Sequence, residues 1–295
     1  MSETVAESYH LCCRIARRTA RNFYYSFVVM PPEKRQAMCA IYAFMRRSDD
    51  IADGATHPAQ ATEDLRRWRA EVVAALSNTV VSPDAQDPGT TIDPILPALA
   101  DTVRRYRIPT QHFHELLDGT EMDQTKARYE TFDELYQYCY HVASVVGLIV
   151  LPIFGYQDEA ARVPAEACGI AFQLTNILRD VKEDAQLGRV YLPREDLEQF
   201  GVYENDLMTG RVTPQFLELM KFETDRAREF YQKAQPLLGM IDPDSRGTLA
   251  VMMGIYGGIL DKIERRRFVV LDGKIRLSTA EKMWIVLKNW MEYRA

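Results

Sequence analysis

The chain has 295 residues, of which 47% are hydrophobic and 26% charged, so it can bury the core of one large domain or two small ones. Its 36 basic and 42 acidic residues give a net charge of −6, which argues against nucleic acid as a partner. The five cysteines lack CxxC spacing and are typical of reduced thiols. The start MSETVAESYH shows no secretory signal, so we expect a cytoplasmic protein.

Proline, glycine and capping residues divide the sequence into helices. Pro31 and Pro32 predict a helix start and Gly54 predicts its end, which gives a long helix over about 33–53. An amphipathic helix follows at about 61–76, then the clearest loop, and helical periodicity resumes in ILPALADTVRRY. Further helices are predicted at about 109–122, 131–154, 163–186, 213–239, 243–267 and 278–294. TFDE and STAE, at the starts of two of these helices, match capping boxes.

Nothing in the sequence suggests a repeat or a membrane span. No heptad series or low-complexity segment is present, and RFVVLDG is a short apolar run with little strand character. The longest apolar stretch covers 14 residues at 142–155, whereas a bilayer span needs roughly 20. We therefore predict a single all-α domain over residues 1–295, a helical bundle with a central apolar cavity.

Two aspartate clusters, about 130 residues apart, carry most of the chemical information. In RRSDDIAD, Asp49 and Asp53 are four residues apart and share a helix face, with Asp50 beside them. In QLTNILRDVKED, the spacing i, i+3, i+7, i+11 predicts one polar stripe along a helix, formed by Gln173, Asn176, Asp180 and Asp184.

Both clusters lie in apolar surroundings, with IYAFM before the first and GIAF before the second. Carboxylates buried in such surroundings repel one another and lose solvation energy unless a positive charge holds them. Mg²⁺ supplies that charge, and proteins usually hold it with a few carboxylates plus substrate phosphates. The two clusters therefore predict a diphosphate site with several Mg²⁺ ions, or Mn²⁺ in their place. A lone DDxxD would more often be a solvated helix face.

Three segments of the chain show a wider resemblance: RNFYYSFVVMPPEKRQAMCAIYAFMRRSDDIAD, YCYHVASVVG and FQLTNILRDVKEDAQLGRVYLP. On these segments the chain resembles the squalene/phytoene synthase family, the head-to-head prenyltransferases, along nearly its whole length. The resemblance implies an all-α isoprenoid-synthase fold. It also implies that two allylic prenyl diphosphates are condensed through their C1 carbons.

Carried over by position, the resemblance implies roles for individual residues. The implied metal ligands are Asp49, Asp53, Asn176, Asp180 and Asp184. The implied substrate-binding residues are Arg21, Asn22, Tyr42, Arg46, Tyr138, Gln173, Arg179, Tyr191 and Tyr256. The residues expected to act in catalysis are Tyr42, Arg46, Asp49, Asp53, Asp180 and Asp184.

The chain departs from the family pattern at two places. Arg21 and Asn22 follow Ala20 where the family often shows serine, lysine and serine, so the charge is kept and one donor replaces the hydroxyls. Gly257 and Gly258 stand where an arginine is common. Neither change affects the aspartates, so we expect an active enzyme with altered substrate or product details.

Four functions compete. The leading hypothesis is condensation of two farnesyl diphosphates to presqualene diphosphate or squalene, because RNFYYSF and KIRLSTAEKMWI resemble bacterial squalene-type members. A phytoene synthase acting on two geranylgeranyl diphosphates is the alternative, which QLTNILRDVKEDAQLGRVYLP favours. A non-catalytic assembly factor would have little reason to keep both carboxylate clusters. A di-iron bundle needs paired ExxH motifs, and only Glu7 to His10 fits.

Cofactors and partners follow from the same chemistry. Use of NADPH stays open, because no GxGxxG follows a predicted strand. The water-insoluble product predicts peripheral contact with the inner membrane face, and downstream isoprenoid enzymes as partners.

Overall fold

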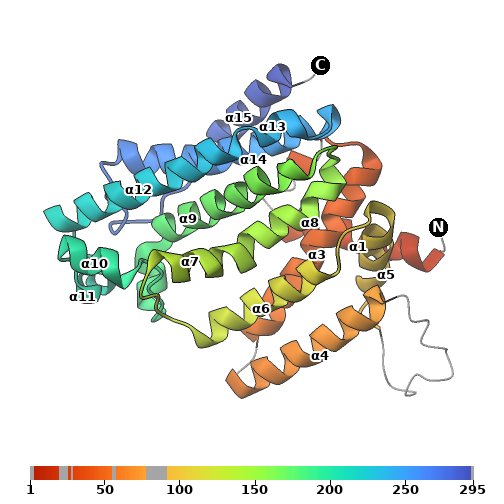
Figure 1. Cartoon of the computed structure of the whole chain (residues 1–295), viewed down its shortest axis with the longest axis horizontal. Helices are drawn as coiled ribbons and strands as arrows, with labels where there is room; N and C mark the ends of the chain where they lie inside the picture. Colours follow the sequence, from red (N-terminus) through yellow and green to blue (C-terminus); the bar gives the residue numbers. More distant parts are fainter. Residues whose placement is uncertain (1–2, 20–25, 28, 55–57, 78–91, 294–295) are drawn as a thin grey trace. The chain divides into compact units, whose positions relative to one another are not determined.

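The computed structural model describes residues 3–19, 26–27, 29–54, 58–77 and 92–293. These residues form helices and no strand; they contain two isolated bridge pairs, Arg128 with Val190 and Tyr156 with Ile241. The prediction of an all-α fold is therefore confirmed (Figure 1). The chain divides into two compact units, residues 1–124 with 149–155 and residues 125–148 with 156–295. Organisation as one domain with a central cavity stays a prediction.

The first unit is built around one long helix. Its helices are α1 (Glu3–Thr19), α3 (Pro32–Gly54), α4 (Pro58–Leu76), α5 (Leu96–Tyr106) and α6 (Gln111–Thr125). Helix α3 contacts α1, α4 and α5. In its core the Phe44 ring lies 6.1 Å from Trp68 and 5.3 Å from Phe113. The Trp68 indole N–H donates to Ser48 Oγ at 2.9 Å, so the polar groups of this core are satisfied.

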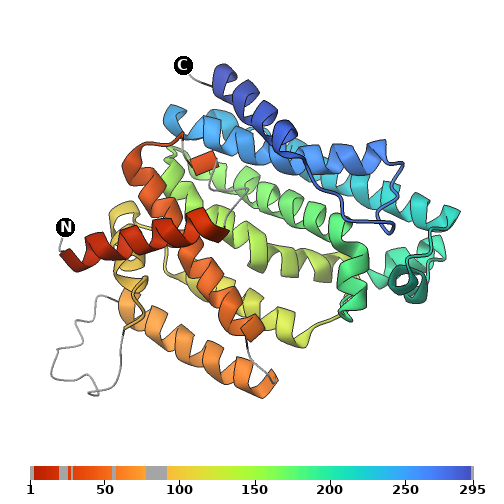
Figure 2. The same ribbon diagram turned by 180° about the vertical axis from the view of Figure 1, so that it is seen from behind.

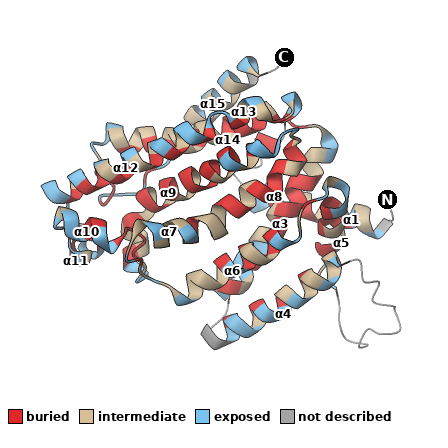
Figure 3. Ribbon diagram, in the orientation of Figure 1, coloured by how far each residue is buried: buried red, intermediate tan, exposed pale blue. Residues whose placement is uncertain are grey.

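The second unit is arranged around α9. Its elements are α7 (Phe132–Cys139), η2 (Tyr140–Ser144), the start of α8 (Val145–Phe154), η3 (Glu159–Ala161), α9 (Arg162–Gln186), α10 (Arg194–Phe200), α11 (Glu204–Thr209), α12 (Pro214–Ala234), α13 (Leu237–Met240), α14 (Pro243–Arg265) and α15 (Thr279–Glu292). Helix α9 contacts α7, η2, α11, α12 and α14, and α15 packs on α14, as both views show (Figures 1 and 2). Buried residues run along the whole of α9 (Figure 3).

Most predicted helices are found within a few residues of their expected bounds. The N-terminal helix α1 and the short helices α10 and α11 were not predicted, and RFVVLDG forms a turn in place of a strand or a continued helix. Most of the predicted loop after α4, residues 78–91, lies outside the described residues.

The two predicted capping boxes differ. At Ser278 both bonds are present, because Glu281 N–H donates to Ser278 Oγ and Ser278 N–H donates to the Glu281 carboxylate. At Thr131 only the hydroxyl cap forms. The Glu134 carboxylate instead accepts from Lys126 Nζ at 2.8 Å and from the Glu130 N–H, so the ion pair draws it away from the cap.

Helices α7, η2 and α8 run without a break from Phe132 to Phe154. By length and composition alone, this 23-residue helix could cross a membrane. However, 56% of its most apolar window is buried inside the protein, which is typical of a core helix. It is longer than the apolar stretch noted in the sequence because its first turns carry polar side chains.

The packing of α9 against η2 requires a glycine. A Cβ at Gly169 would lie 2.4 Å from Ser144 Cα, closer than real contacts allow. We therefore predict that Gly169→Ala lowers the free energy of unfolding by about 1–3 kcal/mol, because two backbones must move apart. Urea denaturation would measure this effect.

The matched control is Gly247→Ala in α14, where a Cβ would meet nothing within 4 Å. It should be neutral or raise the unfolding free energy by about 0.4–1 kcal/mol. Equal urea midpoints for the two variants would contradict this account of the α9–η2 contact.

The cap of α15 predicts a pH dependence of stability. The Ser278 backbone N–H, and then Lys262, lower the pKa of Glu281 to about 2, from an ordinary value of 4.5. A lowered carboxylate pKa stabilises the fold above the unfolded-state pKa, and that stability is lost as the pH falls through the folded-state pKa. Glu281→Gln should therefore lower the urea midpoint at pH 7, and its difference from the unchanged protein should shrink as the pH falls below 4.5. A constant difference down to pH 3 would disagree with this.

Candidate active site

The first predicted cluster lies on α3, in the first unit. Tyr42, Arg46 and Asp49 follow one another along one face of the helix, next to the face that Phe44 and Ser48 bury in the core. Tyr42 is half-buried, and Arg46 and Asp49 are exposed.

Arg46 is the electrostatic centre of this cluster. Its guanidinium lies 2.5 Å from Asp50 Oδ1, and the negative charge of Asp49 also acts on it. Asp50 is exposed, so within this unit the cluster is not buried as its apolar sequence context suggested. Asp53 lies in the last turn of α3, but its side chain is outside the described residues, and Arg21 and Asn22 are outside them altogether.

The second predicted cluster lies on α9, in the second unit. The helix places the four predicted residues on one half-buried face, and its opposite face is buried in the core. The four are Gln173, Asn176, Asp180 and Asp184. Asn176 Nδ2 donates to Gln173 Oε1 at 3.4 Å, which leaves the Asn176 side-chain oxygen as an acceptor.

Asp180 is held by two cationic side chains. Arg179 Nε donates to Asp180 Oδ1 at 3.0 Å, and its terminal nitrogen also binds this carboxylate. Lys274 Nζ, from the segment between α14 and α15, lies 3.0 Å from the same oxygen. Burial acts to raise the pKa of Asp180, but Arg179 and Lys274 outweigh it and hold the pKa below its ordinary value.

Asp184, one turn further along α9, has the opposite shift. Burial and then the negative charge of Asp180 raise its pKa to about 7, and Arg189 and Lys274 offset this only in part. A divalent cation between the Asp180 and Asp184 carboxylates would offset the burial of Asp184 and its repulsion by Asp180. The oxygen donors of Asn176, Asp180 and Asp184 are of the hard type that Mg²⁺ prefers, so these residues fit the predicted ion.

The described residues do not form a complete metal cage. Within these parts of the chain, no group of three or more His, Cys, Asp and Glu side chains is placed to hold a metal ion. Such a cage is not needed for Mg²⁺, which proteins usually hold with one or two carboxylates, water and substrate phosphates.

An aromatic cluster lies in the same unit. The rings of Tyr138 and Tyr191, both predicted to bind substrate, are 5.1 Å apart with an interplanar angle of 24°. Tyr129 lies 5.3 Å from Tyr138 and 5.9 Å from Tyr191, and all three are buried. Tyr191 and Asp184 line the same small pocket between α9 and the segment after it. The aromatic cluster therefore begins close to the second carboxylate cluster.

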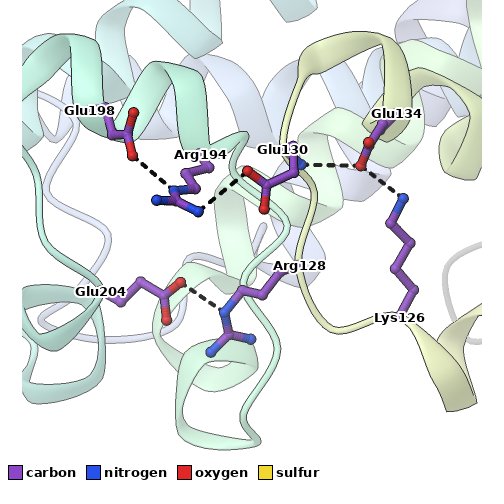
Figure 4. Close-up of polar contacts among 7 residues, drawn as sticks. All are labelled: Lys126, Arg128, Glu130, Glu134, Arg194, Glu198 and Glu204. Atoms are coloured by element: carbon purple, nitrogen blue, oxygen red, sulfur yellow. Dashed lines mark hydrogen bonds and ion pairs between the residues drawn. The ribbon is translucent and has the colours of Figure 1, made fainter.

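A set of surface ion pairs joins the segments that carry Tyr129 and Tyr191 (Figure 4). The drawn residues are Lys126, Arg128, Glu130, Glu134, Arg194, Glu198 and Glu204. Arg128 binds Glu204 Oε1 at 2.8 Å and the Gly188 carbonyl at 2.6 Å. Exposed ion pairs add little stability singly, so their main effect is to fix the alignment of the two segments, together with the Val190 N–H bond to the Ala127 carbonyl.

Tyr256 completes the second group. Its ring stacks on Phe172 of α9, with the ring centroids 4.4 Å apart. Beside it, a Cβ at Gly258 would lie 3.3 Å from Leu277 Cδ1. The glycine that replaces a common arginine therefore lets the segment before α15 approach α14 closely.

Two basic residues near the aspartates were missed from the sequence. Lys274 binds Asp180 from a segment with no helical periodicity, and Arg189 faces Asp184 from the turn that ends α9. Arg189 could have been found from the sequence because it follows Gly188, and a glycine often ends a helix with a tight turn. Gly188 has a φ of 81°, which lets the Arg189 N–H donate to the Asp184 carbonyl at 2.8 Å. We see no sequence signal that would have identified Lys274.

The largest groove found does not coincide with these residues. It measures about 740 Å³ between α12, α14 and α15, and none of the predicted site residues lines it. The chemistry of the side chains, and not cavity volume, therefore locates the candidate site.

We predict that Lys274→Gln lowers kcat/KM for a prenyl diphosphate by about 10- to 100-fold, because a charged hydrogen bond to Asp180 is lost. Steady-state rates at saturating Mg²⁺ would measure this. Arg276→Gln is the control, since Arg276 is exposed two residues further on. Equal rates for both variants would show that Lys274 has no part in the site.

The chain is similar to known proteins along nearly its whole length. Residues 16–281 match the family model for squalene/phytoene synthases. Similar proteins include the phytoene synthase of Arthrospira platensis, 38% identical over 95% of this chain and 91% of the relative, and the 15-cis-phytoene synthase of Synechocystis, 35% identical over 98% and 86%.

Similar solved structures include a dehydrosqualene synthase in complex with ligand, with a TM-score of 0.86 and 29% identity over 98% of both chains. A squalene synthase from Alicyclobacillus acidocaldarius has a TM-score of 0.81 and 28% identity over 91% of this chain and 97% of that one. The family match spans nearly the whole sequence, and the resemblance noted in the sequence is confirmed. The chain belongs to the squalene/phytoene synthase family.

Proposed function

We propose that this protein is a Mg²⁺-dependent prenyltransferase that joins two allylic prenyl diphosphates head to head. The observation that carries the proposal is the half-buried carboxylate face of α9, where Asp180 and Asp184 lie beside Arg179 and Lys274. Hard oxygen ligands next to fixed cationic donors are what recognition of a metal-bound diphosphate requires. Family membership supports the same reaction class.

The residues that would hold the ions are Asn176, Asp180 and Asp184 on α9, with Asp49 and Asp53 on α3. When bound, Mg²⁺ or Mn²⁺ would neutralise the negative charge that develops on the departing diphosphate. Arg46, Arg179 and Lys274 add fixed positive charge for the same oxygen atoms. No proton transfer is needed for this ionisation, so a general acid is not required.

The aromatic residues account for the next step. After the C1–O bond breaks and the electron pair leaves with the diphosphate, an allylic carbocation remains. The double bond of the second donor attacks its C1, and loss of a proton closes a cyclopropane ring. The faces of Tyr138, Tyr191 and Tyr129 offer negative potential to a cation, and their burial limits access of water.

We propose farnesyl diphosphate as the donor, with presqualene diphosphate or squalene as the product. The two similar solved structures with TM-scores of 0.86 and 0.81, a dehydrosqualene synthase and a squalene synthase, support this choice. Geranylgeranyl diphosphate, with phytoene as product, is the second candidate. It is favoured by the higher identity, 35–38%, to the phytoene synthases.

Incubation of the purified full chain with Mg²⁺ and either donor, with and without NADPH, tests both proposals. We expect a C30 cyclopropyl diphosphate from farnesyl diphosphate, identified by mass, and conversion to squalene only in the arm with NADPH if the chain uses a reductant. A C40 triene from geranylgeranyl diphosphate alone would overturn the choice of donor. No product from either donor would overturn the enzymatic proposal and favour an assembly factor.

Asp180→Asn and Asp184→Asn should each lower kcat by about 10²–10³-fold, because each removes a charge that the ions need. Asp225→Asn is the matched control, since Asp225 is exposed on α12 and pairs with Lys221. Initial rates with the preferred donor would compare the three variants. Turnover of an aspartate variant within a few-fold of the control would remove that aspartate from the site.

We also propose a cytoplasmic location with contact at the inner membrane face, together with enzymes that consume the isoprenoid product. The reason is chemical, because both the prenyl chains and the hydrocarbon product partition into lipid.

A further inference from the structure

The outer face of α15 is apolar. Met283, Trp284, Leu287 and Met291 are 56%, 63%, 46% and 59% exposed. They are four of the ten large hydrophobic side chains that are exposed in the described parts of the chain, although α15 has only 14 residues. Three of them are spaced i, i+4, i+8 and share the outward side of the helix, and Trp284 stands at the edge of that side, where it also lines the groove between α12, α14 and α15.

The inner face of α15 is already used for packing. Ile285 lies against α14, where a Cβ at Gly254 would be 2.8 Å from Ile285 Cγ2. Lys262 of α14 holds Glu281 at 3.0 Å. Asn289, also half-buried on this side, donates to the Ile285 carbonyl. Surface helices normally turn the apolar face inward, whereas α15 leaves its larger apolar face outward. The fold of the second unit therefore does not need that face.

Basic residues lie on α15 and in the segment before it, where Lys274 is bound to Asp180 and Arg266 is paired with Asp272. Between Arg265 and Tyr293 the sequence has seven basic and three acidic residues, a net charge of +4 in a chain whose total is −6. Within α15, Lys288 is exposed, and Lys282 is half-buried. One of the three acidic residues, Glu281, is already paired with Lys262. The local charge is thus opposite in sign to that of the rest of the protein.

We propose that α15 is the surface by which this protein docks on an anionic lipid bilayer. An amphipathic helix with tryptophan, leucine and methionine on one face and lysines at its border lies in the interface of a membrane, with the apolar face among the lipid tails. Tryptophan prefers this depth, because its ring is apolar and its N–H needs a polar partner. Basic side chains add attraction to anionic headgroups.

A second copy of the chain is a poorer occupant of this face. In a twofold dimer the same surface meets itself, so two segments of charge +4 would lie against each other and repel. An anionic bilayer instead meets both the apolar face and the surrounding charge. This proposal names the surface that would make the membrane contact proposed above. It rests on the side chains of α15 and does not depend on the chemistry of the α9 carboxylates.

Co-sedimentation of the full chain with vesicles tests this proposal. Phosphatidylcholine vesicles with and without phosphatidylglycerol would be compared. We expect binding to the anionic vesicles, with a bound fraction that falls when salt is added. The double variant Trp284→Gln/Leu287→Gln should lower the partition coefficient by about tenfold or more. Lys282→Gln/Lys288→Gln should weaken binding to anionic vesicles only.

The matched control is Val163→Gln/Tyr203→Gln, which removes two side chains that are each 73% exposed, one in α9 and one just before α11. It should bind like the unchanged protein. Turnover of dissolved substrate without vesicles, and the thermal unfolding curve, should be the same for all variants, so a loss of binding is separated from unfolding and from failure of the proposed reaction.

Three results would overturn the proposal. The first is recovery of the unchanged protein in the supernatant with anionic vesicles, and the second is equal binding by the Trp284→Gln/Leu287→Gln variant. The third is a concentration-dependent dimer in sedimentation equilibrium that this same variant abolishes, which would assign the face to a second copy.

Discussion

Half-buried carboxylates need positive charge beside them, and this need explains the arrangement around the second half of α9. On α9 the fold meets that need for Asp180 with Arg179 and Lys274, but meets it only in part for Asp184, whose pKa rises to about 7. A protein that only had to be stable could have placed apolar side chains there at less cost. The arrangement makes sense when a cation and a diphosphate complete it, and the family to which the chain belongs uses such substrates.

The scaffold around α9 serves this arrangement. Gly169 lets α9 lie close to η2, and Gly188 ends α9 with a turn that brings Arg189 back toward Asp184. The surface ion pairs align the segments of Tyr129 and Tyr191 without adding much stability of their own. The close packing at Gly169, the turn at Gly188 and the nearby charges therefore all position side chains on one face of α9. The apolar face of α15 takes no part in this arrangement.

The helices and the α9 carboxylate face could be predicted from sequence because both follow from regular spacing. Pro32 and Ser278 begin helices for local reasons, and the positions from Gln173 to Asp184 repeat with the period of a helix. Lys274 could not be predicted, because its contact with Asp180 joins residues 94 positions apart through an irregular segment. The predicted bond from the Glu134 carboxylate to the start of α7 does not form, because the carboxylate pairs with Lys126. The length of the prenyl chain that the enzyme accepts depends on the sizes of side chains deep in the substrate pocket. The spacing of residues in the sequence does not show which side chains these are.

We propose that Asp49 on α3 and Asp180 on α9 act on the same metal-bound diphosphate, as membership of the squalene/phytoene synthase family suggests. A double-mutant cycle on the Mg²⁺-dependent binding of inorganic diphosphate, measured by calorimetry with Asp49→Asn, Asp180→Asn and the double variant, would show whether the two residues share a ligand. We predict that binding requires Mg²⁺, that each single substitution weakens it, and that the double variant loses less than the sum of the two. Binding that does not depend on Mg²⁺, or two strictly additive effects, would contradict a shared ligand.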